Sequence, residues 1–196
     1  MTRVSTLAPS ELPEAIRRRI GVDAETQPAQ LGALQVWGRL PDLAGVLLDL
    51  QEALAKLSLE PRLTELVRLR IAYHNQCRSC MALRGADAIE DGLTEELVCE
   101  LEAPETAAEL TDRERAALVY ADRLSIAHHT IDDGLFGRLR EQFTDIEILE
   151  LGAHVAFCLG FGRVAMSWNL VDDLPDALRV DGIVGPWAAP GVLRPG

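Results

Sequence analysis

Apolar side chains recur with helical spacing along most of this chain of 196 residues. Four leucines in residues 43–57 follow one another at intervals of three, four and three positions, one face of an α-helix: Leu47, Leu50, Leu54 and Leu57. After a break at residues 58–61, the pattern predicts a second helix over residues 62–74 with four inward-facing side chains: Leu63, Leu66, Val67 and Ile71. Because no stretch alternates β-branched and polar residues as a strand would, the predicted fold class is all-α.

Helix start and stop signals divide the rest of the chain. A break at positions 75–76 ends the second helix, and a third is predicted from about Cys77 to about Glu90, where an Asp-Gly pair closes it. Two capping boxes begin at Thr111 and Thr144 and predict helices that end near residues 127 and 171. Shorter helices are expected over residues 13–20, 29–38, 95–101 and 132–142.

These elements form one predicted domain, a helix-hairpin bundle with two loosely similar halves. Residues 1–40 are an N-terminal extension, residues 43–100 and 111–172 are the two halves, and residues 174–196 are a tail anchored by Trp187. Three glycines lie in the apolar helix of the second half: Gly152, Gly160 and Gly162. Since glycine weakens a helix unless close packing compensates, we expect another helix, of this chain or of a second subunit, to approach there.

The charge balance narrows the set of partners. The chain has 19 basic and 31 acidic residues, a net charge of −12, and no basic patch, which argues against binding to nucleic acid or to an anionic membrane surface. Residues 1–10 do not resemble a signal peptide, and no stretch has about 18 uninterrupted apolar residues. The expected compartment is therefore the cytoplasm, where a close pair of cysteines is more often redox-active, catalytic or metal-binding than structural.

The sharpest chemical feature is the pair Cys77 and Cys80, separated by two residues. At a helix start their thiols would lie on one face, near unpaired backbone N–H groups and the positive end of the helix dipole, and both lower the pKa of a thiol. Arg84 lies one turn further along the same face, where its guanidinium would favour a thiolate or would pair with an acid such as Asp87.

Glu65 is the candidate proton partner of these thiols. It shares a helical stripe with Leu69 and Ala72, which predicts partial burial and therefore a raised pKa, suited to proton exchange near neutral pH. The alternative is a surface ion pair with Arg62 or Arg68, each three residues away.

Glu65, with Cys77 twelve residues later and then Cys80, resembles the E-x11-C-x-x-C signature of the carboxymuconolactone decarboxylase/AhpD-like superfamily. The resemblance implies an all-helical AhpD-like fold, assembly as a homotrimer or homohexamer, and no metal or organic cofactor. It also implies a peroxidase cycle in which Cys80 attacks a hydroperoxide, Cys77 resolves the product as a disulfide, and Glu65 relays protons. A dithiol reductant or a thioredoxin-like protein would restore the dithiol.

The chain departs from this resemblance at two positions. Arg84 and Ser79 stand where the peroxidases of the family carry histidines, and arginine cannot act as a base at neutral pH. His74, three residues before Cys77, is the candidate replacement; its alternative is a role at the end of its helix.

The sequence also allows a metal site and two other functions. His74, Cys77 and Cys80 could hold zinc with His154 or Cys158, although His154 is more often a satisfied core histidine, and Cys99 and Cys158 read as small buried apolar groups. The function could also be that of a carboxymuconolactone decarboxylase-type lyase, although the decarboxylases of that family generally lack the cysteine pair. A non-enzymatic oligomeric redox sensor is the third reading.

Overall fold

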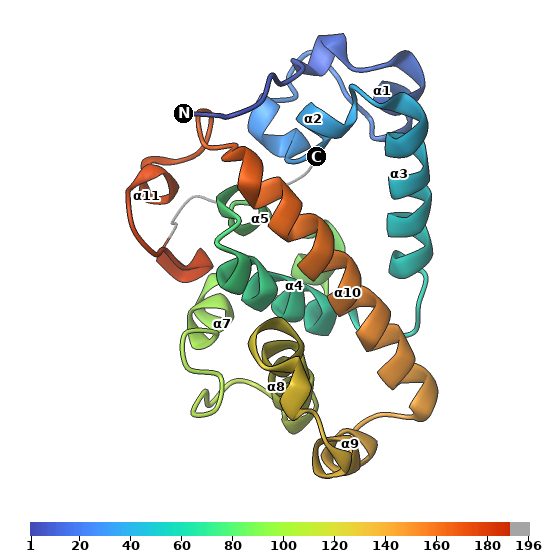
Figure 1. Cartoon of the computed structure of the whole chain (residues 1–196), viewed down its shortest axis with the longest axis vertical. Helices are drawn as coiled ribbons and strands as arrows, with labels where there is room; N and C mark the ends of the chain where they lie inside the picture. Colours follow the sequence, from blue (N-terminus) through green and yellow to red (C-terminus); the bar gives the residue numbers. More distant parts are fainter. Residues whose placement is uncertain (189–196) are drawn as a thin grey trace.

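The computed structural model describes residues 1–188, and this part of the chain contains helices and no β-strand, as the all-α prediction requires (Figure 1). The α-helices are α1 (Glu14–Arg19), α2 (Leu34–Trp37), α3 (Pro41–Ala55), α4 (Pro61–Asn75), α5 (Arg78–Met81), α6 (Ala86–Glu90), α7 (Glu95–Glu100), α8 (Asp112–Ile126), α9 (Asp133–Arg140), α10 (Asp145–Trp168) and α11 (Asp176–Arg179). Short 3₁₀ helices are η1 (Pro9–Glu11), η2 (Pro28–Leu31), η3 (His128–Thr130) and η4 (Pro186–Ala188).

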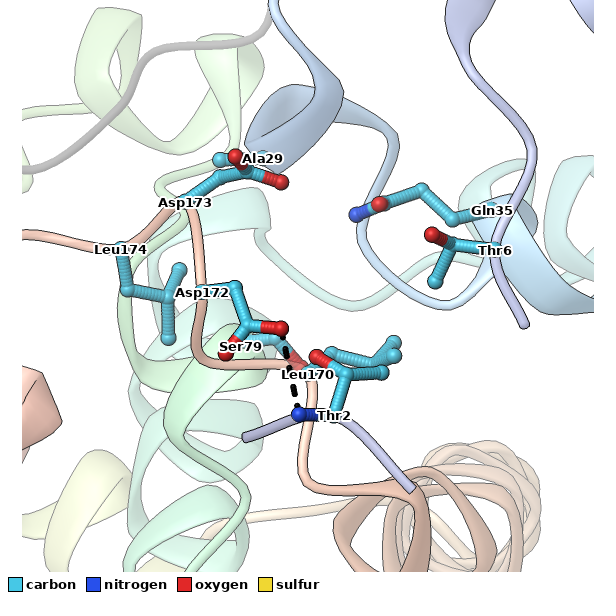
Figure 2. A pocket seen from close by; sticks show the side chains of 9 residues that line it. All are labelled: Thr2, Thr6, Ala29, Gln35, Ser79, Leu170, Asp172, Asp173 and Leu174. Carbon is cyan, nitrogen blue, oxygen red and sulfur yellow. Dashed lines mark hydrogen bonds between the residues drawn. The ribbon is translucent and has the colours of Figure 1, made fainter. Parts of the chain in front are cut away.

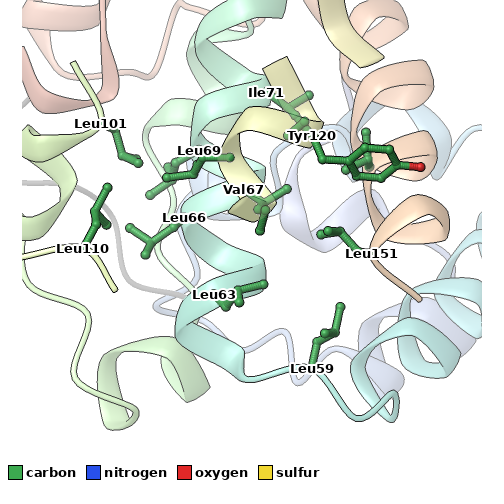
Figure 3. Close-up of a cluster of buried hydrophobic side chains, with 14 of the residues drawn as sticks. Leu59, Leu63, Leu66, Val67, Leu69, Ile71, Leu101, Leu110, Tyr120 and Leu151 are labelled. Carbon is green, nitrogen blue, oxygen red and sulfur yellow. The ribbon is translucent and has the colours of Figure 1, made fainter. Parts of the chain in front are cut away.

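Helix α4 is the centre of the fold and packs against both α8 and α10 (Figure 1). The four side chains predicted to face inward on α4 are all buried, so that prediction is confirmed. Figure 3 shows side chains of α4 reaching toward Leu101 and Leu110 on one side and toward Tyr120 and Leu151 on the other. Buried on nearly all sides, α4 is a rigid support for the polar residues that it carries.

Helix α3 is less embedded than its leucine pattern predicts. Leu47 is buried, but Leu50 is 41% exposed, so the prediction of a single inward stripe is wrong at that position. The reason is that α3 meets α1 and α2 through a small separate cluster around Ala44 and Leu48, which leaves the other side of the helix uncovered.

The predicted helix from Cys77 to Glu90 is instead two short helices, α5 and α6. Cys77 is the N-cap of α5, as expected, but the backbone leaves the helical conformation before Gly85, the extended residue that begins α6. Arginine side chains take the carbonyl oxygens of Met81 and Leu83 in this interval. Those carbonyls therefore find their hydrogen bonds outside a continuous helix.

Local capping chemistry is where the sequence predicts the fold best. Thr111 and Thr144 both accept a hydrogen bond from the backbone of the third helical residue, and the glutamate there bonds back to the threonine N–H, so both capping boxes are confirmed. Helix α4 ends at Gln76, whose φ of 51° puts it in the left-handed region. That residue turns the chain directly into the cysteine pair.

Helix α10 is long and apolar enough, by length and composition, to cross a membrane. It packs against α4, α8 and α9, but only 22% of its most apolar stretch is buried. One such helix is weak evidence for a membrane span.

Two of the three glycines of α10 lie where the helix is closely approached. A Cβ atom at Gly162 would lie 2.7 Å from Nδ2 of Asn75, and one at Gly152 would lie 3.4 Å from the Tyr120 hydroxyl. A Cβ atom at Gly160 would meet nothing within 4 Å. The predicted close approach is thus made by α4 and α8 of the same chain at two positions, and the third faces open space.

This difference gives a matched pair of substitutions in one helix. We expect Gly162→Ala to lower the free energy of unfolding by about 1–3 kcal/mol, because the new methyl group displaces the buried Asn75 amide. Asn75 Nδ2 donates to the carbonyl oxygens of Cys158 and Leu159, and these bonds would be disturbed. Gly160→Ala should raise the free energy by up to about 1 kcal/mol, since alanine is the better helix former. Urea denaturation measures both, and equal effects of the two substitutions would contradict the packing argument.

Candidate functional site

The two cysteines of the pair are joined by a disulfide, with their Cα atoms 5.2 Å apart. Cys77 is completely buried, whereas Cys80, inside α5, is only partly buried. Helix α5 has four residues, so its dipole is much smaller than the predicted longer helix would provide. Stabilisation of a thiolate here must therefore come mainly from side chains.

The side chain that reaches the cysteine pair is Arg68. Its Nη1 donates to the carbonyl oxygen of Cys80 at 2.7 Å, and its Nη2 donates to the carbonyl oxygen of Leu83 at 2.8 Å. The same guanidinium makes a two-point ion pair with Glu65, with distances of 2.6 Å from Nε and 2.7 Å from Nη2. Arg68 thus brings a permanent positive charge to the backbone of Cys80, whereas the helical spacing predicted this role for Arg84.

Glu65 is buried, as predicted, but the prediction of a raised pKa is wrong. Burial by itself raises the pKa of this carboxyl group, but the charge and hydrogen bonds of Arg68 outweigh that effect and hold the pKa below its usual value. The backbone N–H of Gly85, which donates to Oε1 at 2.9 Å, and the charge of Arg84 lower it further. Glu65 is therefore a carboxylate at neutral pH. The alternative prediction, an ion pair with Arg68 at the surface, is correct in its partner, but Glu65 is buried.

Arg84 has a structural role. It is 1% exposed, and its guanidinium makes a two-point ion pair with Glu95 at 2.9 and 3.0 Å, so the expected pairing with Asp87 is wrong. It also donates to the carbonyl oxygens of Met81 and Pro186. Its charge therefore acts on the site through Glu65, while its hydrogen bonds hold the loop after α5.

The hydrogen-bond partner of His74 is on α8 and not in the cysteine pair. Its Nε2 is 2.6 Å from Oδ1 of Asp122 on α8, and Arg70 makes an ion pair with the same carboxylate. This agrees with the alternative of a role at the end of its helix. Among residues 1–188 no three His, Cys, Asp or Glu side chains gather as metal ligands, so the zinc arrangement does not form there.

His154 and Cys158 are the residues near the site that the sequence interpretation set aside. On α10, the His154 Nε2 lies 2.9 Å from the carbonyl oxygen of Thr64 and 3.7 Å from the Cys158 sulfur. Burial lowers the pKa of His154, with a further contribution from the charge of Arg68, so the imidazole is neutral; burial raises the pKa of Cys158 to about 12. Cys158 is therefore an unreactive thiol, and Cys99, predicted to be buried, is exposed. The spacing of four residues on one helix was the sequence feature that could have predicted the contact between His154 and Cys158.

The segment that follows α10 folds back over the cysteine-bearing turn, passes α11 and reaches α7 (Figure 1). We call residues 178–188 the strap. Gln76 exchanges two hydrogen bonds with the backbone of Val184, and Arg78 donates to the carbonyl oxygens of the strap at three positions: Leu178, Val180 and Gly182. The ring of the predicted anchor Trp187 packs against that of Tyr73 in a tilted arrangement, with the ring centroids 4.8 Å apart. Residues 189–196 of the predicted tail lie outside the described part.

Known proteins share both the sequence pattern of this site and the fold that carries it. The sequence profile of the carboxymuconolactone decarboxylase family matches residues 41–123, a stretch that includes Glu65 and both bonded cysteines. A crystal structure of an alkylhydroperoxidase AhpD core, an uncharacterized peroxidase-related protein from Ralstonia eutropha JMP134, is 25% identical with a TM-score of 0.67 over 94% of this chain and 97% of that one. Residues 41–123 of the chain thus match the carboxymuconolactone decarboxylase family, and the described chain has the AhpD-like fold. The predicted resemblance and the AhpD-like fold are confirmed, and the superfamily includes enzymes.

Relatives of this AhpD-like chain carry no assigned activity in their names. The uncharacterized protein Rv2313c of Mycobacterium tuberculosis (strain ATCC 25618 / H37Rv) is 39% identical over 119 residues, which is 59% of this chain and 41% of that protein. The chain thus spans less than half the length of that relative. The uncharacterized protein YnjA of Escherichia coli (strain K12) is 26% identical over 170 residues, 85% of this chain and 90% of that protein.

The charge state of Glu65 leads to a test by pH. A carboxylate whose pKa is lowered on folding stabilises the fold above the unfolded pKa of about 4.3, and this stabilisation is lost as the pH falls through the folded pKa. We expect Glu65→Gln to cost about 3 kcal/mol at pH 7, because it leaves the largely buried Arg68 without its anion, and the gap to wild type should shrink below about pH 4. Urea denaturation at both pH values measures it. Glu14→Gln, which breaks the exposed pair with Arg18, is the control and should have little effect; a gap for Glu65→Gln that is constant with pH would contradict the assigned charge.

Proposed function

We propose that this protein is a thiol-dependent oxidoreductase of the peroxidase type, which reduces hydroperoxides through a dithiol/disulfide cycle of Cys77 and Cys80. The observation that supports it most is the unequal environment of the two sulfurs. Cys80 is partly exposed and has the Arg68 guanidinium hydrogen-bonded to its carbonyl oxygen, whereas Cys77 is completely buried. An attacking thiol must be reachable and ionised, so Cys80 is the attacking thiol and Cys77 the resolving one.

In the first step the Cys80 thiolate attacks the terminal oxygen of a hydroperoxide. The O–O bond breaks, the sulfur becomes a sulfenic acid, and the alkoxide takes a proton and leaves as an alcohol. Cys77 then attacks the Cys80 sulfur, which forms the disulfide and releases water. An external dithiol or a thioredoxin-like protein in the cytoplasm returns two electrons by thiol–disulfide exchange, and becomes a disulfide itself.

Glu65 is the proposed proton relay of this cycle, together with Arg68. Its Oε2 accepts a hydrogen bond from Arg68 Nε, which leaves a lone pair to receive the thiol proton, directly or through water. Because the Arg68 charge lowers the pKa of Glu65, the carboxylate returns that proton readily and holds it only transiently. His74 and Arg84 keep supporting roles in this proposal, His74 through its bond to Asp122 and Arg84 through the loop that carries Gly85.

The assignment of Cys80 is tested by turnover of tert-butyl hydroperoxide with a dithiol reductant. We expect Cys80→Ser to remove turnover, a loss of at least about 10³-fold, because serine is not ionised near neutral pH. Cys99→Ser, at an exposed thiol outside the pair, is the control and should retain the wild-type rate. Equal rates for wild type and Cys80→Ser would remove the proposal.

The lyase reading has one observation in its favour. The ionised Glu65–Arg68 pair exists without any contribution from the sulfurs, and a carboxylate beside a guanidinium could act as a base on a lactone. Conversion of γ-carboxymuconolactone by a variant that lacks both cysteines would favour that function over the peroxidase.

A homo-oligomer is the second part of the proposal, and the exposed face of α10 supports it. Four apolar residues recur there at intervals of three and four, all exposed in the single chain: Ile146, Leu149, Ala153 and Ala156. This spacing is the seam along which two helices pack in a coiled coil. The exposed side of α3 adds Leu43, Val46 and Leu50 with the same spacing. We propose that a second copy covers these side chains in a trimer or hexamer.

Light scattering after gel filtration measures this assembly. We expect a mass that is a multiple of the 21.4 kDa chain, and we expect Leu149→Glu to shift it toward a single chain, because it would bury a charge in the seam. Ile126→Glu replaces an equally exposed apolar residue at the end of α8 and should leave the mass unchanged. A wild-type protein of 21.4 kDa in solution would overturn the oligomer.

A further inference from the structure

A small cavity of about 40 Å³ lies beside the cysteine-bearing turn (Figure 2). Its walls come from the N-terminal segment, α2, the start of α5 and the residues after α10, and none comes from α4. Most of its polar lining is made by hydroxyl, amide and carboxylate groups: Thr2, Thr6, Gln35, Ser79, Asp172 and Asp173. The cavity is therefore a space for polar contents, separate from the Glu65–Arg68 pair.

Gln35 indicates what this cavity can hold. The residue is 6% exposed, and its side chain lines the cavity. Figure 2 shows this amide directed from α2 toward the carboxylate of Asp173 across the space. A buried amide is normally satisfied by protein or ordered water, and a water needs roughly 10–15 Å³ of such space. The cavity therefore has room for about two or three water molecules that could hydrogen-bond to Gln35.

Ser79 connects this cavity to the disulfide. It is 5% exposed, it lines the cavity, and its Oγ lies 3.6 Å from the sulfur of Cys77. Because a disulfide sulfur carries no hydrogen, the serine hydroxyl is the donor in this contact. Ser79 is thus in contact with both the buried sulfur of Cys77 and the cavity.

We propose that Ser79 and the water of this cavity form the proton path of Cys77, distinct from the proton path of Cys80. The proposal rests on the thiol cycle above. When the disulfide closes, the Cys77 S–H bond breaks as its sulfur attacks the sulfenic sulfur of Cys80. Ser79 Oγ accepts that proton and passes its own to cavity water, while the hydroxide expelled from the sulfenic acid takes a proton from solvent at the exposed side of Cys80 and leaves as water, so that no net proton is gained or lost. When an external thiolate attacks Cys80, the S–S bond breaks, Cys77 leaves as a thiolate, and the same path returns a proton to it.

The burial of Cys77 makes such a path necessary. A thiolate without contact with solvent is costly unless a hydrogen-bond donor faces it, and Ser79 is such a donor. The charged groups that line the cavity are Asp172 and Asp173, while the neighbouring Arg78 is engaged with the strap. Asp172 is itself bonded to the backbone N–H of Thr2 (Figure 2). Both aspartates are exposed, so this side of the cavity borders bulk solvent.

The first test measures Cys77 alone and needs no peroxide turnover. In a Cys80→Ser background, ¹³Cβ NMR of labelled cysteine gives the pKa of Cys77, and we expect Ser79→Ala to raise it by about one unit through loss of one hydrogen bond. Ser79→Thr keeps a hydroxyl and should restore the original value. Ser125→Ala is the matched control, a buried serine in α8 whose hydroxyl has no partner in the described chain, and should not change it. An unchanged pKa in Ser79→Ala would overturn the proposal.

The second test separates this path from the peroxidase function. In the otherwise wild-type chain, Ser79→Ala should slow disulfide closure about tenfold and shift its pH profile upward by the same pKa change. The preceding oxidation of Cys80, followed in a Cys77→Ser background, should keep its rate. A closure rate equal to that of wild type would contradict the path. Absence of peroxide oxidation together with the expected shift in the Cys77 pKa would instead reject the peroxidase and leave the Ser79 contact established.

Discussion

The buried guanidinium of Arg68 is the interaction on which the site depends. It joins α4 to the turn after α5, because it bonds Glu65 in its own helix and the carbonyl oxygens of Cys80 and Leu83 across the gap. Without it, the carbonyl oxygen of Cys80 would lose this hydrogen bond, Leu83 would keep only Arg84 as a donor, and Glu65 would keep only the N–H of Gly85, each at a cost comparable to a lost hydrogen bond or more. The group that fixes the backbone of Cys80 is therefore also the cation hydrogen-bonded to it, so a substitution of Arg68 would change folding and site together.

The order of the helices and most of their ends could be predicted from the sequence, since these depend on neighbours within four residues. The inward face of α4, the capping boxes at Thr111 and Thr144, and the stop at Gln76 were all correct for that reason. The continuous helix from Cys77 to Glu90 was wrong because the carbonyl oxygens of Cys80 and Leu83, in its middle, accept hydrogen bonds from Arg68 on α4. The local sequence around a helix does not reveal a hydrogen-bond donor that comes from a distant part of the chain.

In the candidate site, too, the local features could be predicted and the non-local ones could not. The proximity of Cys77 and Cys80 is local and was predicted, as was the burial of Glu65. The sign of the Glu65 pKa shift was not, because burial and an adjacent cation act in opposite directions and only geometry decides which prevails. Arg84 could not be placed either: its partners Glu95 and Pro186 lie 11 and 102 residues away. The hydrogen-bond partners of a residue in the structure are thus stronger evidence for its role than its residue type alone.

The strap has a consequence for the chemistry of any incoming reductant. Because Arg78, between the two cysteines, is held by three strap carbonyls, the turn cannot swing outward to present both sulfurs. In the proposed thiol cycle, an approaching thiolate would meet a disulfide with one open end and would expel the same sulfur each time. Reduction would then be regioselective: the mixed disulfide would form on Cys80 alone, and the second thiol of the reductant would attack its own sulfur to release the Cys80 thiolate.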